Sequence, residues 1–271
     1  MLRRAVRRCV AAAMVLVAVA PTASSAGSRV VPPPAAAQAD YQLGGAYDPP
    51  LGTRIVERDR TARPAPGAYG ICYVNGYQTQ PGENAWWRSK HPDLLLRDKS
   101  GHTVQDPGWP GELLLNTSSA ATRRAIASVE YGWIDGCARS GFSAVEADNL
   151  DSWTRSRGLL GIAGNVALAR LLNGRAHLRG LASAQKNTPE LASQGRRLGF
   201  DFAVAEECGV YDECSAYTHA YGGRVIEIEY TDNGRAAYDR SCRAAAGRRS
   251  ILLRDRLLTD LTAAGYLYRS C

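Results

Sequence analysis

Eight short apolar runs, most of them followed by a helical segment, predict that this 271-residue chain folds as one (β/α)8 barrel of class α/β. Strands that alternate with helices are typical of a parallel sheet with crossover connections. About 230 residues follow residue 40 without a low-complexity break, which is a common length for one such barrel. Polar side chains also gather where the apolar runs end, as they do at the active end of barrels.

The N-terminal region predicts export. Residues 1–26 contain four arginines, then twelve apolar residues and a small-residue cleavage site, which together are typical of a signal peptide. Residues 27–40 are Pro/Ala-rich and predict a flexible or extended leader, and residues 41–271 form the expected barrel domain. The signal carries +4 of the formal net charge of +7, which leaves +3 for the rest. We therefore expect a secreted, extracellular protein with no membrane segment after cleavage, and the export route stays open.

The eight runs give the expected strands in order. They are Tyr41–Leu43, Arg54–Glu57, Tyr69–Asn75, Ser143–Asn149, Leu181–Asn187, Phe202–Glu207, Arg224–Tyr230 and Ser250–Asp255. Two further runs, Leu94–Asp98 and Leu113–Asn116, predict an inserted segment between the third and fourth strands.

Helix signals lie between the later strands. Thr117 to Ser119 offer N-caps for a helix that ends near Ser140, before Gly141. Further helices are predicted at Leu160–Arg179, from Pro189 onward, at Glu213–Tyr221 and at Gly234–Ala246.

Six cysteines remain after the signal, and an even number in an exported chain predicts three disulfides. The short spacing favours Cys208–Cys214, and we expect Cys72–Cys137 and Cys242–Cys271 among the fifteen possible connectivities. No Cys-x-x-Cys pair is present and the histidines are isolated, so neither a metal nor another cofactor is expected. Basic residues are scattered among acidic ones, which argues against nucleic acid as a partner.

Acidic side chains share faces at the strand ends. Because side chains alternate along a strand, Ala144, Glu146 and Asp148 should share one face. The same reasoning places Glu206 on the face of Phe202 and Val204, and Glu229 on the face of Val225 and Glu227. We therefore expect these carboxylates, with Lys186, to point into one barrel mouth that suits acid/base work on glycosidic bonds and attracts a cationic substrate.

The residues resemble a known family, glycoside hydrolase family 114, the endo-α-1,4-polygalactosaminidases. The resemblance spans nearly all of the chain after the leader and rests on five motifs. They are Ile71-Cys-Tyr-Val-Asn75, Gly141-Phe-Ser-Ala-Val-Glu-Ala-Asp-Asn-Leu-Asp151, Gln185-Lys-Asn187, Asp201-Phe-Ala-Val-Ala-Glu-Glu-Cys208 and Glu229-Tyr230. Two positions depart from the family's pattern, since Ala147 replaces a frequent Pro and Ala205 a frequent Asn.

The resemblance implies a barrel that cleaves α-1,4-linked galactosamine polymers internally, without a metal. It places the catalytic carboxylates at Asp148 and Glu206. With the strand-end side chains and one loop tryptophan, the expected substrate-binding residues are Tyr73, Glu146, Asn149, Asp151, Trp153, Lys186, Asn187, Glu229 and Tyr230. Two alternatives stay open: a non-catalytic carbohydrate-binding barrel, and a barrel glycosidase for another glycan such as a neutral α-galactan. We expect a monomer.

Overall fold

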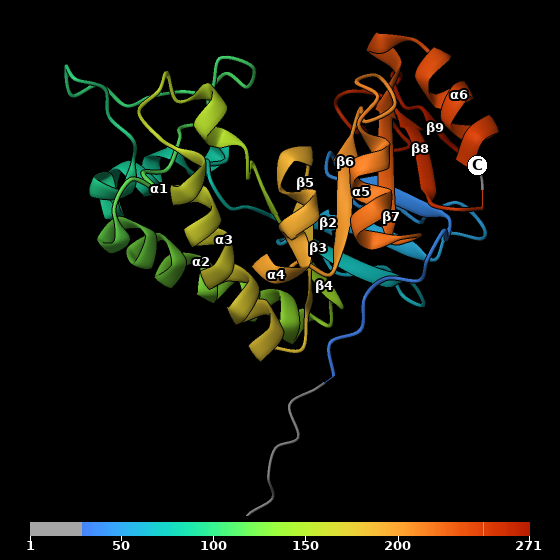
Figure 1. Cartoon of the computed structure of the whole chain (residues 1–271), viewed down its shortest axis with the longest axis horizontal. Helices are drawn as coiled ribbons and strands as arrows, with labels where there is room; N and C mark the ends of the chain where they lie inside the picture. Colours follow the sequence, from blue (N-terminus) through green and yellow to red (C-terminus); the bar gives the residue numbers. More distant parts are fainter. Residues whose placement is uncertain (1–28, 246) are drawn as a thin grey trace, which may run out of the picture.

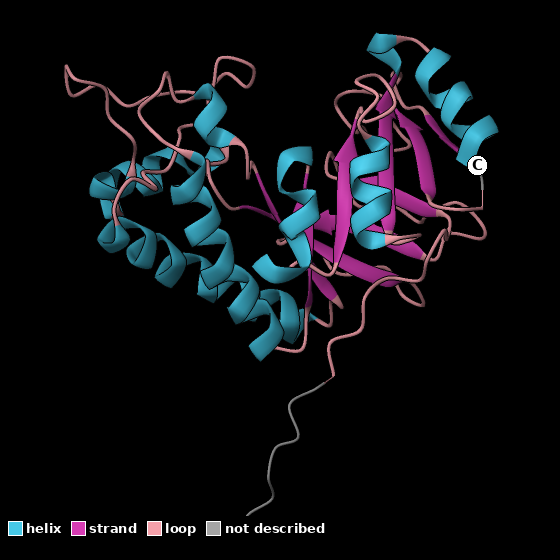
Figure 2. Cartoon of the chain, in the orientation of Figure 1, coloured by secondary structure: helices cyan, strands magenta, loops and turns pink. Residues whose placement is uncertain are grey.

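A computed structural model describes residues 29–245 and 247–271, and it shows a nearly closed barrel of strands with helices outside it (Figures 1 and 2). The predicted (β/α)8 fold is confirmed, and each predicted strand is present within two residues of its expected ends. The signal-peptide prediction lies outside the described residues. The strands are β1 (Ala39–Gln42), β2 (Ile55–Asp59), β3 (Tyr69–Asn75), β4 (Ala144–Asp148), β5 (Ala182–Lys186), β6 (Phe202–Glu206), β7 (Val225–Tyr230), β8 (Ser250–Arg254) and β9 (Tyr268–Ser270).

The strands follow one another around the barrel in sequence order, and β1 to β8 are parallel. The antiparallel β9, which the sequence did not predict, pairs with β8. Side chains join β8 and β9 to the first strand: Arg254 contacts Asp40 at 3.1 Å, and the Tyr268 hydroxyl donates to the Ala39 carbonyl at 2.9 Å. The barrel therefore has a seam between β1 and β8 that side chains hold.

Helices cover the outside of the later strands (Figure 2). The α-helices are α1 (Asn84–Lys90), α2 (Ala120–Ser140), α3 (Ile162–Leu178), α4 (Gly195–Leu198), α5 (Cys214–Tyr221) and α6 (Ala236–Ala245). Short 3₁₀ turns lie at Pro81–Glu83, Pro92–Leu94, Ser152–Arg155, Pro189–Gln194 and Thr231–Asn233. As predicted, α2 begins after the Ser119 cap, which forms a capping box with Thr122, and ends at Gly141 in the left-handed conformation.

Two apolar layers lie on opposite faces of the strands. The barrel interior contains Ile71, Ala144, Phe202 and Ile228, among other buried side chains. The outer layer lies between the strands and the helices. It contains Ala203 from β6 and apolar side chains from the two long helices, α2 and α3. Burial on both faces is expected for parallel barrel strands, and the interior column of each strand leads to the mouth.

The inserted segment between α1 and α2 forms short antiparallel bridges, including Leu95 with Leu115 and Gln105 with Leu113. It lies at one end of the barrel, among the green loops at the upper left of Figure 1. The expectation of an insertion between the third and fourth strands is confirmed.

The three expected disulfides are formed: Cys72–Cys137, Cys208–Cys214 and Cys242–Cys271. The third joins α6 to the end of β9. Across the described residues, no helix has both the length and the apolar character that a membrane crossing needs.

The Pro/Ala-rich leader reaches into the barrel at its end. Strand β1 begins at Ala39, and Ala36 N–H donates to the Gly223 carbonyl at 2.9 Å. The division at residue 40 stays a prediction.

Candidate active site

The C-terminal ends of β4 and β6 place two carboxylates, Asp148 and Glu206, in one cavity of about 330 Å³. These two are called the mouth carboxylates below. Their strands are separated by β5, whose last residue, Lys186, contacts both of them: Nζ lies 3.2 Å from Asp148 Oδ1 and 3.4 Å from Glu206 Oε2. The predicted grouping of these three side chains is therefore present in the structure.

Asp148 is held as an anion. The Tyr73 hydroxyl donates to Oδ2 at 2.8 Å, and the Asn149 backbone N–H donates to Oδ1 at 2.6 Å. Burial opposes ionisation, but Lys186 and these two donors outweigh it, so the pKa of Asp148 lies below its usual value. Asp148 is thus ionised at neutral pH, as a nucleophile or a charge stabiliser must be.

Glu206 is oriented by neighbours on both sides. The Tyr230 hydroxyl, from the end of β7, donates to Oε1. Asn187 Nδ2 donates to Oε2 at 3.2 Å, while Asn187 Oδ1 accepts from the Glu206 backbone N–H at 2.8 Å. Its side chain is one-quarter exposed, so the carboxyl group is open to a substrate in the cavity.

Lys186 and Glu146 lie beneath the cavity and do not line it. Both are buried, and Nζ of the lysine contacts Glu146 Oε1 at 2.9 Å and the Tyr41 hydroxyl at 3.0 Å. Burial disfavours the ammonium, but Asp148, Glu146 and Glu206 outweigh it and raise the pKa of Lys186 well above its usual value. Neither residue is placed for the direct substrate contact that the sequence suggested, because both side chains are enclosed by the barrel. Lys186 contacts the mouth carboxylates from below, and Glu146 holds the ammonium of Lys186 in place.

The chain leaves these strands through left-handed turns. Asn149, Asn187, Thr188 and Glu207 have φ between +48° and +67°. Asparagine tolerates this conformation better than other non-glycine residues, whereas a β-branched residue such as Thr188 is strained there. Such strain is common at functional sites. Here the left-handed conformation reverses the direction of the chain directly after the strands that carry the site.

Sequence reasoning missed several cavity residues. Tyr41, Asp106, Glu112 and Arg256 line the cavity, and Trp109 lies at its rim with 47% exposure. Three of them come from the inserted segment, where no strand periodicity marks a side chain's direction. Asn75 donates to Glu112 at 3.0 Å.

Two predicted loop residues do lie in the cavity. Asp151 forms an ion pair with Arg155 at 2.8 Å, and Arg155 also donates to Asn149 at 2.9 Å. Arg155 is paired with Asp106 as well, at 2.5 Å. This guanidinium therefore fixes the loop that follows β4 to the inserted segment.

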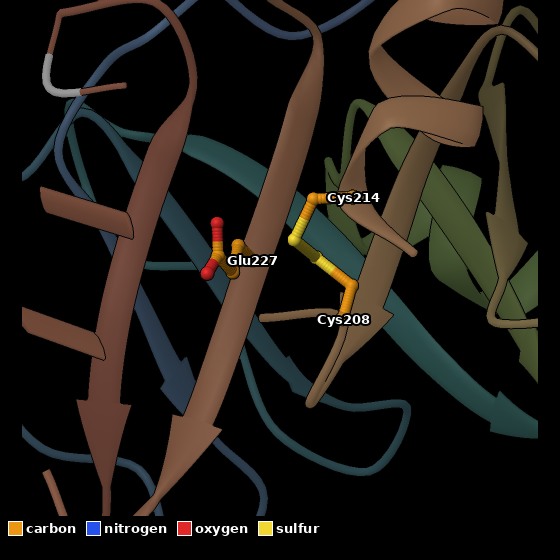
Figure 3. Close-up of side chains that lie close together, drawn as sticks. All are labelled: Cys208, Cys214 and Glu227. Carbon is orange, nitrogen blue, oxygen red and sulfur yellow. A yellow bond between two sulfur atoms is a disulfide. The ribbon is translucent and has the colours of Figure 1, made fainter. Parts of the chain in front are cut away.

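The expectation that Glu229 points into the mouth is wrong. Ile228 and Tyr230 face the barrel interior, so Glu227 and Glu229 face outward toward α5 and α6. Figure 3 shows Glu227 on β7 beside the Cys208–Cys214 disulfide. Glu229 accepts from Gly209 N–H at 2.8 Å, and burial raises its pKa to about 8. The sulfurs are bonded to each other and are not thiolate ligands for a metal.

Trp153 is also turned away from the cavity. Its indole packs against a small apolar cluster that includes Leu96, Leu114 and Leu160. The expected role in substrate binding is therefore not supported, because the 3₁₀ turn Ser152–Arg155 places the indole against residues of the inserted segment.

A parallel barrel with two carboxylates at the C-terminal ends of its strands is an arrangement that glycoside hydrolases use. The chain belongs to glycoside hydrolase family GH114, whose model matches residues 19–271.

Solved structures show the same fold. The structure of Aspergillus fumigatus Ega3 in complex with galactosamine matches with a TM-score of 0.71 and 20% identity, covering 92% of this chain and 100% of that one. The glycoside hydrolase domain of PelA from Pseudomonas aeruginosa matches with a TM-score of 0.55 and 15% identity, covering 83% and 96%. No curated protein sequence matches this chain.

Proposed function

We propose that this glycoside hydrolase cleaves α-1,4-linked galactosamine-containing polysaccharide internally, using Asp148 as nucleophile and Glu206 as general acid/base. The observation that carries the proposal is the Lys186 ammonium, which contacts both mouth carboxylates in one cavity. Family membership and the galactosamine in the Ega3 structure support the substrate class.

The contacts of each carboxylate support its role. Asp148 accepts three hydrogen bonds or ion contacts, which favour its ionised form. In the proposed first step, its carboxylate attacks the anomeric carbon while Glu206 gives its proton to the departing glycosidic oxygen. In the second step Glu206 takes a proton from water, which attacks the same carbon and releases Asp148.

The separation of the two groups supports retention of configuration. One oxygen of each mouth carboxylate contacts Lys186 Nζ, at 3.2 and 3.4 Å. The distance between these two oxygens therefore cannot exceed the sum of the two contacts, and it is shorter whenever the three atoms are not in a straight line. Retaining enzymes hold their carboxyl groups about 5–5.5 Å apart, and inverting enzymes about 6.5–9.5 Å. Magnetic resonance of the first-formed product should therefore show the α-anomer, and an initial β-anomer would refute retention.

The surroundings of the cavity suit a cationic polymer. Five carboxylate residues line it and only two arginines do, both of them paired with acids. A second cavity of about 380 Å³ adjoins the first and shares Asp151, Asn187 and Glu206 with it. Space on both sides of Glu206 supports binding of sugars on both sides of the cleaved bond, as internal cleavage requires.

The decisive experiment compares Asp148→Asn and Glu206→Gln with Asp93→Asn, an exposed aspartate of the 3₁₀ turn Pro92–Leu94. Reducing ends released from deacetylated and N-acetylated galactosaminoglycan would be counted by mass spectrometry. Each mouth variant should lose at least about a hundredfold in turnover, with a melting temperature near wild type, while the control keeps its activity. Near-normal turnover in either mouth variant would reject the assignment.

Binding of oligomers by the wild type without any new reducing ends would favour a carbohydrate-binding barrel instead. Three disulfides support passage through an oxidising compartment, and we propose that the protein acts outside the cell, as a monomer.

A further inference from the structure

A second buried carboxyl lies below the site and takes no part in the mechanism above. Glu57, on β2, is 2% exposed, and neither of its oxygens has a hydrogen-bond partner among the described residues. Glu146 is fully buried, and its Oε2 likewise has no partner in that part of the chain. Unsatisfied carboxylate oxygens at such depth are costly, so the two oxygens of Glu57 and the one of Glu146 require an explanation.

The two carboxyls explain each other. Glu57 shares the interior face of β2 with Ile55, and Glu146 shares the interior face of β4 with Ala144. Strands β2 and β4 are alternate strands of the barrel, whose interior side chains meet in layers, and two anions there would repel strongly. A single proton between them removes the repulsion and makes a hydrogen bond, as in other paired buried carboxyls. The proton belongs on Glu57, because Glu146 Oε1 already accepts from Lys186 at 2.9 Å and from Tyr41 at 3.3 Å.

We propose that Glu57 is a protonated carboxylic acid that donates a hydrogen bond to Glu146. The bond keeps Glu146 ionised, and ionised Glu146 holds the Lys186 ammonium between the mouth carboxylates. Glu57 is thus a positioning residue for hydrolysis, although it touches neither the cavity nor the substrate.

Charge balance supports this arrangement. The groups that face Glu57 are Glu146 and Asp148 from β4, Lys186 from β5 and Tyr41 from β1, and Lys186 connects them to Glu206 on β6. One ammonium already faces several carboxyls in this buried cluster. An ionised Glu57 would add a further negative charge with no cation of its own, whereas a neutral Glu57 adds only a donor.

The proposal predicts opposite results for two substitutions. Glu57→Gln keeps a donor, because the amide N–H can bond to Glu146, and should keep the pH limbs of kcat/KM. Glu57→Met removes the donor, so Glu146 takes up a proton and its negative charge is lost from the site. The acidic limb, which Asp148 sets, should then move to lower pH by about one unit, the shift expected when a charge within about 6 Å is removed. A merely structural role would lower the melting temperature of Glu57→Met without moving either limb.

The kinetic readout rests on the proposed hydrolysis, but the protonation of Glu57 can be measured on the protein alone. Infrared difference spectra of wild type against Glu57→Gln at neutral pH should show the carbonyl stretch of one protonated carboxylic acid, absent from the variant. A carboxylate band in its place would overturn the proposal, even if the wild type proved inactive or Glu57→Met failed to fold. Equal pH profiles for Glu57→Met and wild type, or a Glu57→Gln profile displaced like that of Glu57→Met, would also overturn it.

Discussion

Each mouth carboxylate accepts a hydrogen bond from a different tyrosine, so the two contacts can be removed one at a time. Tyr73 donates to Asp148 at 2.8 Å, and Tyr230 donates to Glu206. Replacing each with phenylalanine removes one hydroxyl and leaves the ring that packs in the barrel. Because the Tyr73 hydroxyl stabilises ionised Asp148, Tyr73→Phe should make this carboxyl hold a proton to higher pH, whereas Tyr230→Phe removes a donor that orients Glu206.

The size of the effect follows from the kind of bond. A hydrogen bond to a charged group contributes about 1.5–3 kcal/mol, and one pKa unit corresponds to about 1.4 kcal/mol. Lys186 and the Asn149 N–H remain in Tyr73→Phe, so the pKa of Asp148 should rise by about one to two units. On the acidic side of the profile, each unit lowers kcat/KM tenfold.

The assay is the pH dependence of kcat/KM on soluble deacetylated galactosamine oligomers, with detection of reducing ends. Tyr73→Phe should move the acidic limb to higher pH, because Asp148 must be ionised, whereas Tyr230→Phe should lower kcat/KM without moving that limb. If Tyr230→Phe moved the acidic limb and Tyr73→Phe did not, the roles of the two carboxylates would be exchanged. If Tyr73→Phe left the acidic limb in place, the reasoning from these contacts would be refuted.

Three further predictions concern single charged groups. Lys186→Met leaves buried carboxylates without their cation and should lower the free energy of unfolding in urea by about 3–5 kcal/mol. The exposed control Lys90→Met should lower it by less than about 0.5 kcal/mol, and equal losses would contradict the prediction. Burial raises the pKa of Glu112 to about 7, so the KM for a deacetylated substrate should fall as pH rises through 7, and Glu112→Gln should abolish this fall while an N-acetylated substrate shows none. The raised pKa of Glu229 means that the folded chain keeps a proton that the unfolded chain releases near its ordinary value; the melting temperature should therefore fall as pH rises from about 4.5 to 8, and less steeply in Glu229→Gln.

The barrel and the part of the site on β4 could be predicted because the residue pattern distinguishes the two faces of the strand. In β4 the residues on one face are Ala144, Glu146 and Asp148, and only this face can lead small and then acidic groups toward the mouth. The family's motifs also lie on the strand ends, where the backbone fixes the side-chain direction. The same alternation places Lys186 on the interior face of β5 with Ala182 and Ala184.

Strand β7 shows where alternation stops being informative. Both of its faces are buried, so Glu227 and Glu229 could be assigned to either side with equal apolar support. Adjacent residues of a strand point to opposite faces, so Glu229 and Tyr230 could not both belong to the mouth. In the structure Tyr230 lines the cavity, and Glu229 points away from it.

The cavity wall from the inserted segment could not be derived either. Glu112 and Trp109 lie in irregular backbone, whose course depends on tertiary contacts, such as the pair of Arg155 with Asp106, rather than on a repeating pattern. Strand β9 has three residues, which is too short for a periodic signal, and it is held by pairing with β8 and by the Cys242–Cys271 disulfide.

The seam between β1 and β8 allows this part of the barrel to open locally without the other strands. Elsewhere neighbouring strands are joined by continuous backbone ladders, whereas here Arg254 and Asp40 supply much of the connection. Amide hydrogens of β1 should therefore exchange with solvent sooner than those of β4 to β6. Tyr41 belongs to β1 and contacts Lys186, so each opening of this part of the barrel would briefly remove one hydrogen-bond partner of the ammonium that orients the mouth carboxylates.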